Sequence, residues 1–299
     1  MSVIEKKHEL EAYFHDAGKP RERWRVGTEY EKVGIYRDTG QAIPYFGKRS
    51  VDFILRELIE RFGWEPEEQD GNIIALTRDK AQITLEPGGQ IELSGEPCES
   101  IHCTYAEFDQ HIRELLEVTE PLGIIFLGLG MQPVSRLEQI EWVPKQRYRI
   151  MAPYMLKVGK LGQRMMKQTA TVQANIDYSD EKDAMAKFRT GMGLAPVLIA
   201  MFANSPICDG QLNGYRSFRE HIWTDTDRNR SGLLKFAFAP EVSFAHYVEY
   251  ALDVPMYFIV RNKNYIDMTA VTFRQFLTSG YNGERATIED WNDHLTTLF

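Results

Sequence analysis

The stretch Ile83-Thr-Leu-Glu-Pro-Gly-Gly-Gln-Ile-Glu-Leu-Ser94 has the clearest period of two in the chain. Its apolar residues share one parity and its polar residues share the other, namely Ile83, Leu85, Ile91 and Leu93 against Thr84, Glu86, Gln90, Glu92 and Ser94. Such alternation predicts β-structure with one buried face. The central Pro-Gly-Gly indicates either a bulged strand or a tight hairpin. In both cases Glu86 and Glu92 lie on the polar face of a sheet.

Two further segments repeat this arrangement. In Arg25–Tyr36, Glu29 and Glu31 share a parity with Val33 and Ile35, so their carboxylates point toward a face that is apolar further along the strand. Acids directed toward an interior need cations or a metal ion to compensate their charge. In residues 168–178, five polar residues, Gln173 and Asn175 among them, alternate with apolar ones. This strand lines a wet cavity or, alternatively, exposes its polar face to bulk water.

The composition is that of an ordinary soluble globular protein of 299 residues, with 43% hydrophobic and 26% charged residues. We expect a single domain over residues 1–299, since no repeat or Pro/Ser-rich linker divides the chain. The net charge of -8 gives no reason to expect a nucleic-acid partner. The longest apolar stretch, Met192–Phe202, is too short to span a bilayer, so no membrane partner is expected.

The three cysteines, Cys98, Cys103 and Cys208, form neither an even disulfide set nor a metal-binding spacing. We therefore expect free thiols, with a redox-active Cys98–Cys103 pair as the alternative. The N-terminus has no signal-peptide or transit-peptide character. Together these features predict a reducing, cytoplasmic location.

Helices are expected among the strands. Ser50–Phe62 has an apolar stripe at helical spacing, with Ser50 as N-cap and Gly63 in the position of a C-cap glycine. Asp70-Gly71 marks a hairpin turn. Half-polar alternating strands mixed with helices predict an α+β fold with a mainly antiparallel sheet.

The polar residues suggest one chemistry. Carboxylate and amide oxygens from three strands suit a hard cation such as Mg²⁺, which bridges nucleotide phosphates. A basic segment, residues 144–167, and the sequence Arg216–Asp227, which contains Arg219 and Trp223, suit an anionic substrate. The alternative for the basic segment is a solvated helix face. Neither a Walker sequence nor a complete dinucleotide-binding fingerprint occurs.

Several motifs, in unbroken order from about residue 20 to the last residue, resemble glutamate–cysteine ligase of the plant and proteobacterial type. They are Gly27-Thr-Glu-Tyr-Glu-Lys32, Leu85-Glu-Pro-Gly-Gly-Gln-Ile-Glu-Leu-Ser-Gly95, Phe126-Leu-Gly-Leu-Gly130 with Gln132-Pro133, Tyr154-Met-Leu-Lys-Val-Gly159, Phe202-Ala-Asn-Ser-Pro206, Arg219-Glu-His-Ile-Trp-Thr-Asp-Thr-Asp227 and Tyr250-Ala-Leu-Asp-Val-Pro-Met-Tyr257. The resemblance implies a glutamine synthetase-like fold, in which a curved antiparallel sheet forms a funnel with helices packed around it.

The resemblance also implies a reaction and its residues. ATP, with Mg²⁺, phosphorylates the γ-carboxylate of glutamate, and the amino group of cysteine attacks the acyl phosphate. The partners would be these three small molecules, and the protein would be a monomer or a homodimer. By the same resemblance, the site residues are Glu29, Glu31, Glu86 and Glu92 for Mg²⁺, Gln173 and Asn175 for the cofactor, Arg147 and Arg219 for the substrate carboxylate or the phosphoryl group, and Trp223 and Tyr257 for the amino-acid pocket.

Two departures from the family pattern qualify these expectations. Tyr105 and Met268 stand where plant members have cysteines of regulatory disulfides, so that switch is expected to be absent. Family members also continue past the segment that ends at Phe299, with a further acidic and arginine-containing motif beside the nucleotide. The chain is therefore expected to be either a fragment of such a protein or a shortened relative with lost or changed activity. Two alternative functions also stay open: a carboxylate–amine ligase with another amine acceptor, and a shortened relative that binds ATP or glutamate without catalysis.

Overall fold

The computed structural model describes residues 2–299. A seven-stranded antiparallel sheet is the main sheet of the fold. The order is β2-β3-β4-β5-β1, and the long strand β1 pairs along its other edge with β7 and then with β6. The strands are β1 Val26–Tyr36, β2 Glu65–Gln69, β3 Asn72–Arg78, β4 Ala81–Leu85, β5 Ile91–Ser94, β6 Ile124–Leu127 and β7 Val172–Ile176. The expected α+β class with a mainly antiparallel sheet is confirmed.

The Ile83–Ser94 stretch forms the hairpin β4–β5, the second of the two expected alternatives. Leu85 pairs with Ile91 across the turn, and Gly89 has a φ of +84°. A Cβ on Gly88 would lie 2.1 Å from the carbonyl oxygen of Lys167, so only glycine lets that backbone pass so close. The Pro-Gly-Gly sequence thus both turns the chain and admits a neighbouring segment.

Two helices cover one face of the sheet. The α2 helix, Val51–Phe62, begins at Ser50, whose hydroxyl accepts the Phe53 N–H, and ends at Gly63 with a φ of +70°, as predicted. The α3 helix, Ile101–Thr119, packs beside it. The large hydrophobic cluster contains the apolar faces of β3, β4 and β5 together with α2 residues such as Leu55. Because these apolar residues are buried on one face, the residues that alternate with them lie on the opposite face of the sheet.

The remaining helices build the rest of the molecule. They are α1 His8–Asp16, α4 Tyr148–Val158, α5 Gly162–Gln168, α6 Glu181–Met201, α7 Phe218–Trp223, α8 Phe244–Asp253, α9 Phe273–Ser279 and α10 Ile288–Leu295. Short 3-10 turns occur at Arg21–Arg23, Glu120–Leu122, Leu137–Gln139 and Lys235–Phe238, and two small hairpins are formed by β8 Ile207–Cys208 with β9 Gln211–Leu212 and β10 Phe258–Arg261 with β11 Asn264–Asp267. No helix within residues 2–299 combines the length and the apolarity needed to cross a membrane.

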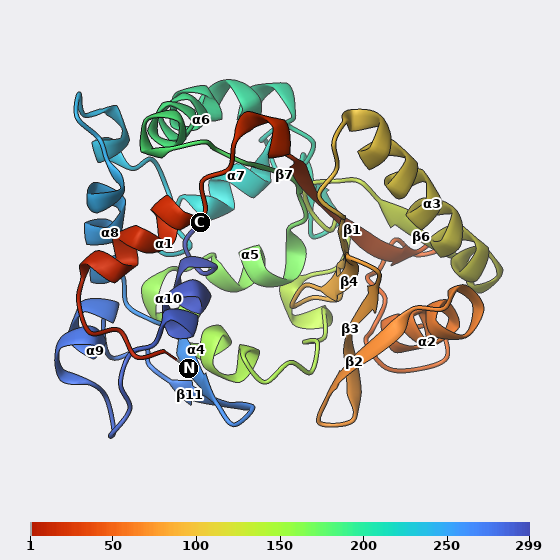
Figure 1. Cartoon of the computed structure of the whole chain (residues 1–299). Helices are drawn as coiled ribbons and strands as arrows, with labels where there is room; N and C mark the ends of the chain where they lie inside the picture. The colour runs from red at the N-terminus through yellow and green to blue at the C-terminus, as the bar shows by residue number, and fades with distance from the viewer. Residues whose placement is uncertain (1) are drawn as a thin grey trace.

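A second hydrophobic cluster lies away from the sheet. It joins α1, α8, α9 and α10 to the β10–β11 hairpin around the fully buried Trp291. In Figure 1 these elements lie on the left, the sheet with α2 and α3 lies on the right, and α4 and α5 lie between them. The central helices therefore face the side of the sheet that α2 and α3 leave free.

The prediction of free thiols is wrong for two of the three cysteines. Cys98 and Cys103 form a disulfide with their Cα atoms 5.7 Å apart. An antiparallel bridge to Val26 holds Cys98 beside β1, and Cys103 lies in the first turn of α3, so the start of the helix brings the two sulfurs together. Spacing alone does not reveal this contact. Cys208 is free and buried.

Candidate active site

Glu29 and Glu31 point away from α2 and α3. Their neighbour Tyr30 contacts Phe108 of α3, with ring centroids 5.0 Å apart, and alternate residues of a strand face opposite sides. Across the sheet Glu31 lies directly opposite Glu92 of β5, and Glu29 lies opposite Gln173 of β7. The sequence-predicted polar faces of three strands therefore form one surface.

Hydrogen bonds from the same and neighbouring strands hold these carboxylates in place. Thr84 and Ser94 donate their hydroxyls to the two oxygens of Glu92, at 2.9 and 2.7 Å. The backbone N–H of Thr171 donates to Glu31 at 2.9 Å. Gln173 and Asn175 donate their side-chain amides to the two oxygens of Glu29, at 2.5 and 3.1 Å. Neutral donors thus orient the acids.

The acids are close enough to repel one another. Burial, followed by the charges of Glu86 and Glu92, raises the pKa of Glu31 to about 9, although Arg219 opposes the shift. Burial also raises the pKa of Glu86, against the opposing effect of Arg147, and the charge of Glu92 adds to the rise. A face that raises carboxyl pKa values in this way favours a bound cation.

Two arginines approach this face from separate elements. Arg219 lies in α7, where its backbone N–H donates to the Ser205 hydroxyl at 3.0 Å, and Arg147 immediately precedes α4. The Nε atoms of both guanidinium groups are buried without a hydrogen-bond partner among the described residues. Burial lowers the pKa of Arg219, although Glu31 opposes the shift. Buried donors left free in this way suit an anionic ligand.

Lys145 adds a third cation near Glu86. Its ammonium group donates to the Leu85 carbonyl at 2.9 Å, next to the turn of the β4–β5 hairpin. Burial and the neighbouring Arg147 lower the pKa of Lys145 to about 8, although Glu86 opposes the shift. Lys145 therefore extends the basic side of the site.

The two aromatic candidates lie in different surroundings. Trp223 ends α7 with its ring 5.7 Å from the Arg219 guanidinium, and its indole N–H is buried without a hydrogen-bond partner in residues 2–299. Tyr257 is only 1% exposed and packs against the Arg230 guanidinium at 3.8 Å. Trp223 accompanies the cationic side of the site, whereas Tyr257 is part of the core behind it.

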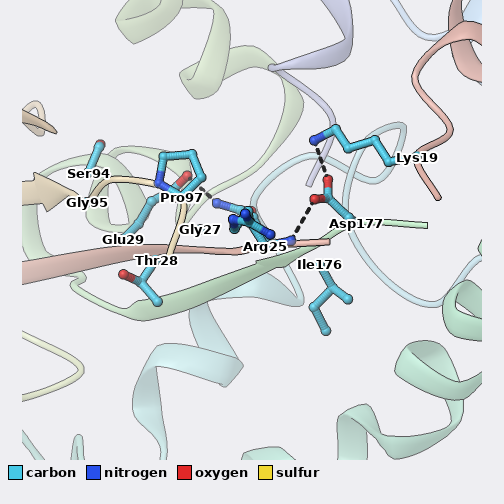
Figure 2. Close-up of a pocket in the computed structure, with 11 residues that line it drawn as sticks. Lys19, Arg25, Gly27, Thr28, Glu29, Ser94, Gly95, Pro97, Ile176 and Asp177 are labelled. Atoms are coloured by element: carbon cyan, nitrogen blue, oxygen red, sulfur yellow. Dashed lines mark hydrogen bonds and ion pairs between the residues drawn. The ribbon is translucent and has the colours of Figure 1, made fainter. Parts of the chain in front are cut away.

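A pocket of about 360 Å³ opens at the Glu29 end of this face. Figure 2 shows Glu29 beside Ser94 and Pro97, with Arg25 between them and the Lys19–Asp177 ion pair. Lys19 contacts Asp177 at 2.6 Å, and the Arg25 backbone N–H donates to the same carboxylate at 2.9 Å. The volume is within the range for small-ligand sites.

The acids share a face without converging on one point. Within residues 2–299, no three His, Cys, Asp or Glu side chains stand at the spacing of a metal site. The donor set nevertheless consists only of oxygens, and burial together with the neighbouring acids disfavours the ionised forms of Glu31 and Glu86 when no cation is bound. This chemistry fits a hard divalent cation that draws the carboxylates inward.

Sequence comparison is consistent with this arrangement. The model of glutamate-cysteine ligase family 2 matches residues 25–299. The chain belongs to this family. A chloroplastic glutamate–cysteine ligase B of japonica rice is 51% identical over 296 residues, which is 98% of this chain and 59% of the rice protein. Chloroplastic glutamate–cysteine ligases of the same rice (form A) and of tobacco are 50% and 48% identical.

The family comparison has two consequences. The chain spans about three-fifths of the length of the curated relatives it matches. The prediction of a cytoplasmic location is wrong, because these relatives are named chloroplastic enzymes. The part of its basis that expected free thiols fails as well, because Cys98 and Cys103 form a disulfide.

Some contributors were not identified from the sequence. Thr84 and Ser94 share the polar parity with Glu92, which was the available signal for their supporting role. Lys32 lies on the opposite face, where burial lowers its pKa to about 7 although Glu92 and Glu31 oppose the shift. The fully buried Asp227–Arg230 ion pair supports Tyr257, and no local pattern distinguishes it from the neighbouring surface charges.

Proposed function

We propose that this chain catalyses ATP-dependent ligation of the glutamate γ-carboxylate to the amino group of cysteine, the first step of glutathione synthesis. The γ-carboxylate oxygen attacks the terminal phosphorus of ATP and releases ADP. The cysteine nitrogen then attacks the acyl carbon, phosphate leaves, and the nitrogen loses a proton. The relatives named glutamate–cysteine ligase support this choice.

One observation carries the proposal. Acids from β1 and β5 and from the β4–β5 turn face two arginines whose Nε donors lack partners among residues 2–299. Such a surface has acids whose ionised forms lack a compensating cation on one side and unsatisfied cationic donors on the other. A reaction between two anions, one neutralised by a cation on the acids and the other by the arginines, fits both sides of this surface.

The residues divide into roles accordingly. Glu29, Glu31, Glu86 and Glu92 would hold Mg²⁺, which when bound neutralises charge between ATP and glutamate. Gln173 and Asn175 hold Glu29 and so position the nucleotide side of the site. Arg147 and Arg219 bind the carboxylate of glutamate and the phosphoryl group in transfer. Trp223 borders the pocket for the amino acids, and Tyr257, which the sequence assigned to that pocket, supports it from the core behind.

The direct test is ADP release measured with ATP, glutamate, cysteine and Mg²⁺, each omitted in turn, with the mass of the product. We expect turnover only with all four and a product of the mass of γ-glutamylcysteine. ADP release that ignores glutamate would contradict the proposal. Mg²⁺-ATP binding by calorimetry without turnover would identify the chain as non-catalytic.

A panel of amines tests the acceptor. We expect cysteine to be used at the highest kcat/KM, because the named relatives join glutamate to cysteine. A different preferred amine in the same assay, identified by product mass, would retain the ligase chemistry and replace the acceptor.

A further inference from the structure

The second half of α6 is apolar but not buried. From Arg189 to Phe202 no residue is buried. Leu194, Val197, Leu198 and Met201 recur at spacings of three and four, so they form one stripe, which Phe202 extends. Met201 is 69% exposed and Phe202 is 72% exposed. A stripe of this kind normally packs against another element.

The neighbouring strand β7 also has an unprotected edge. It pairs only with β1 among the described strands. The Glu31 N–H donates to the Thr171 carbonyl, so by alternation the backbone groups of Gln173 and Asn175 face β1 and those of Val172, Ala174 and Ile176 face outward. The side chains of Val172 and Ile176 are exposed as well.

The opposite edge of the sheet shows how this protein protects a strand that stays exposed. Strand β2 has the sequence Glu-Pro-Glu-Glu-Gln, and three acids and a proline discourage pairing with another chain. Strand β7, Val-Gln-Ala-Asn-Ile, has neither a charge nor a proline. This contrast indicates that the β7 edge is made to be paired.

The α6 stripe and the β7 edge belong to one surface, the α6–β7 flank, defined by Val172 and Ile176 with Leu194, Val197, Leu198, Met201 and Phe202. Four residues separate the end of β7 from the start of α6. Past its other end Asn204 donates to the Gly128 carbonyl, while Ala170, just before β7, donates to the Gly130 carbonyl. The segments after α6 and before β7 therefore both contact the loop that follows β6, and Figure 1 shows α6 and β7 near one another along its upper side.

We propose that the α6–β7 flank is the docking surface for the part of the family polypeptide that this chain does not span, which adds a strand to β7 and packs an apolar face on α6. The matched relatives are longer by about two-fifths of their own length. Strand addition supplies the missing backbone partners, and apolar contact covers the stripe. The added strand lies next to Gln173 and Asn175, so docking also borders the candidate site.

The test compares this chain with a chimera in which the rice relative's sequence continues after Phe299. Hydrogen exchange is followed at the outward amides of Val172, Ala174 and Ile176. We expect at least tenfold slower exchange at these amides in the chimera, and a loss of that protection in a chimera carrying Leu198→Glu with Met201→Glu. Exchange needs no turnover, so its outcome is separate from that of the ligase assay.

The matched control is Ile101→Glu in α3, which is as exposed as Phe202, at 72%, but lies outside the flank. It should leave the protection unchanged. A second variant, Ala174→Pro, removes only an outward N–H and should lower protection at its neighbours without touching a bond to β1. Unchanged exchange in the chimera would overturn the proposal.

Measurements on the chain alone distinguish two other possible occupants of the α6–β7 flank, a second copy of the chain and lipid. Light scattering over a concentration series would reveal a dimer, and abolition of that dimer by Leu198→Glu with Met201→Glu would assign the flank to a second copy. Flotation with phosphatidylcholine vesicles that depends on the same residues would assign it to lipid. Either result would overturn the proposal, and a monomer that does not float supports it.

Discussion

At the scale of single residues, the candidate site contains acids that disfavour one another's ionised forms and a buried arginine with a donor that is free within residues 2–299 when no ligand is bound. The pKa of Glu31 is raised to about 9 by burial and by Glu86 and Glu92, and burial of Arg219 removes water from a guanidinium whose Nε has no partner among the described residues. The two residues are near enough for each to offset the other's pKa shift. A ligand that brings both a cation and an anion relieves both.

Arg219→Lys should lower the kcat of the ligase assay by about 100-fold or more, because a single ammonium cannot reproduce the directed donors that stabilise charge in transfer. Arg216→Lys is the control, since Arg216 lies three residues earlier and is exposed. Steady-state rates at saturating substrates measure the effect. Equal rates for the two variants would remove Arg219 from the transfer step.

His294 predicts a pH dependence of folding stability. Burial lowers its pKa to about 4, although its Nε2 contacts the Ala251 carbonyl at 2.8 Å. The unfolded chain takes up a proton at the ordinary pKa near 6.5, so the stability from neutral His294 is present above that pH and is lost as the pH falls toward 4. The loss amounts to about 3 kcal/mol at 1.4 kcal/mol per pH unit.

Urea unfolding of the wild type and of His294→Gln at pH 7 and pH 4.5 checks this prediction. The free energy of unfolding of the wild type should fall more steeply than that of the variant between the two values. Parallel pH dependences would show that His294 does not carry the effect.

At the scale of elements, the sequence predicts what is set locally. The period of two in Ile83–Ser94 predicted the face of Glu92, and Ser50 and Gly63 predicted both ends of α2. The Cys98–Cys103 disulfide and the approach of Arg219 to Glu31 were not predictable from pattern, because both depend on how β1, α3 and α7 meet in space. Tyr257 shows the same limit, since its burial against Arg230 is a long-range contact.

Ser50→Ala should lower the free energy of unfolding by about 1 kcal/mol, because the Phe53 N–H loses its acceptor at the start of α2. Ser100→Ala is a matched control. Ser100 is the N-cap of α3, but its hydroxyl accepts no hydrogen bond from the helix, so loss of that hydroxyl should cost little. Denaturant titrations of both variants give the comparison, and equal losses would contradict the capping argument.

Cys103→Ser should lower the free energy of unfolding by about 2 kcal/mol, the loop-closure value for a bridge across so few residues. Dithiothreitol should destabilise the wild type by a similar amount and leave the variant unchanged. Mass spectrometry after alkylation would verify the bridge. A wild type that is insensitive to the reductant would exclude a structural contribution.

At the scale of the whole molecule, α2 and α3 cover one face of the sheet, and the central helices α4 and α5 lie toward its other face (Figure 1). Arg147, just before α4, lies near Glu86 on that face. The helical cluster around Trp291 supports the segment that carries Tyr257. Membership of glutamate-cysteine ligase family 2 agrees with this division. The sheet also has a protected edge at β2 and an open edge at β7, where we propose that the family's additional length joins.

The most direct test of the acidic face is Mn²⁺ binding in the presence of ATP, measured by electron paramagnetic resonance. Mn²⁺ is a paramagnetic substitute for Mg²⁺. Glu31→Gln and Glu92→Gln should each weaken binding at least tenfold, whereas Glu68→Gln, on the exposed edge strand β2, should not change it. Equal Mn²⁺ affinity in all three variants and the wild type would contradict a cation site on the sheet.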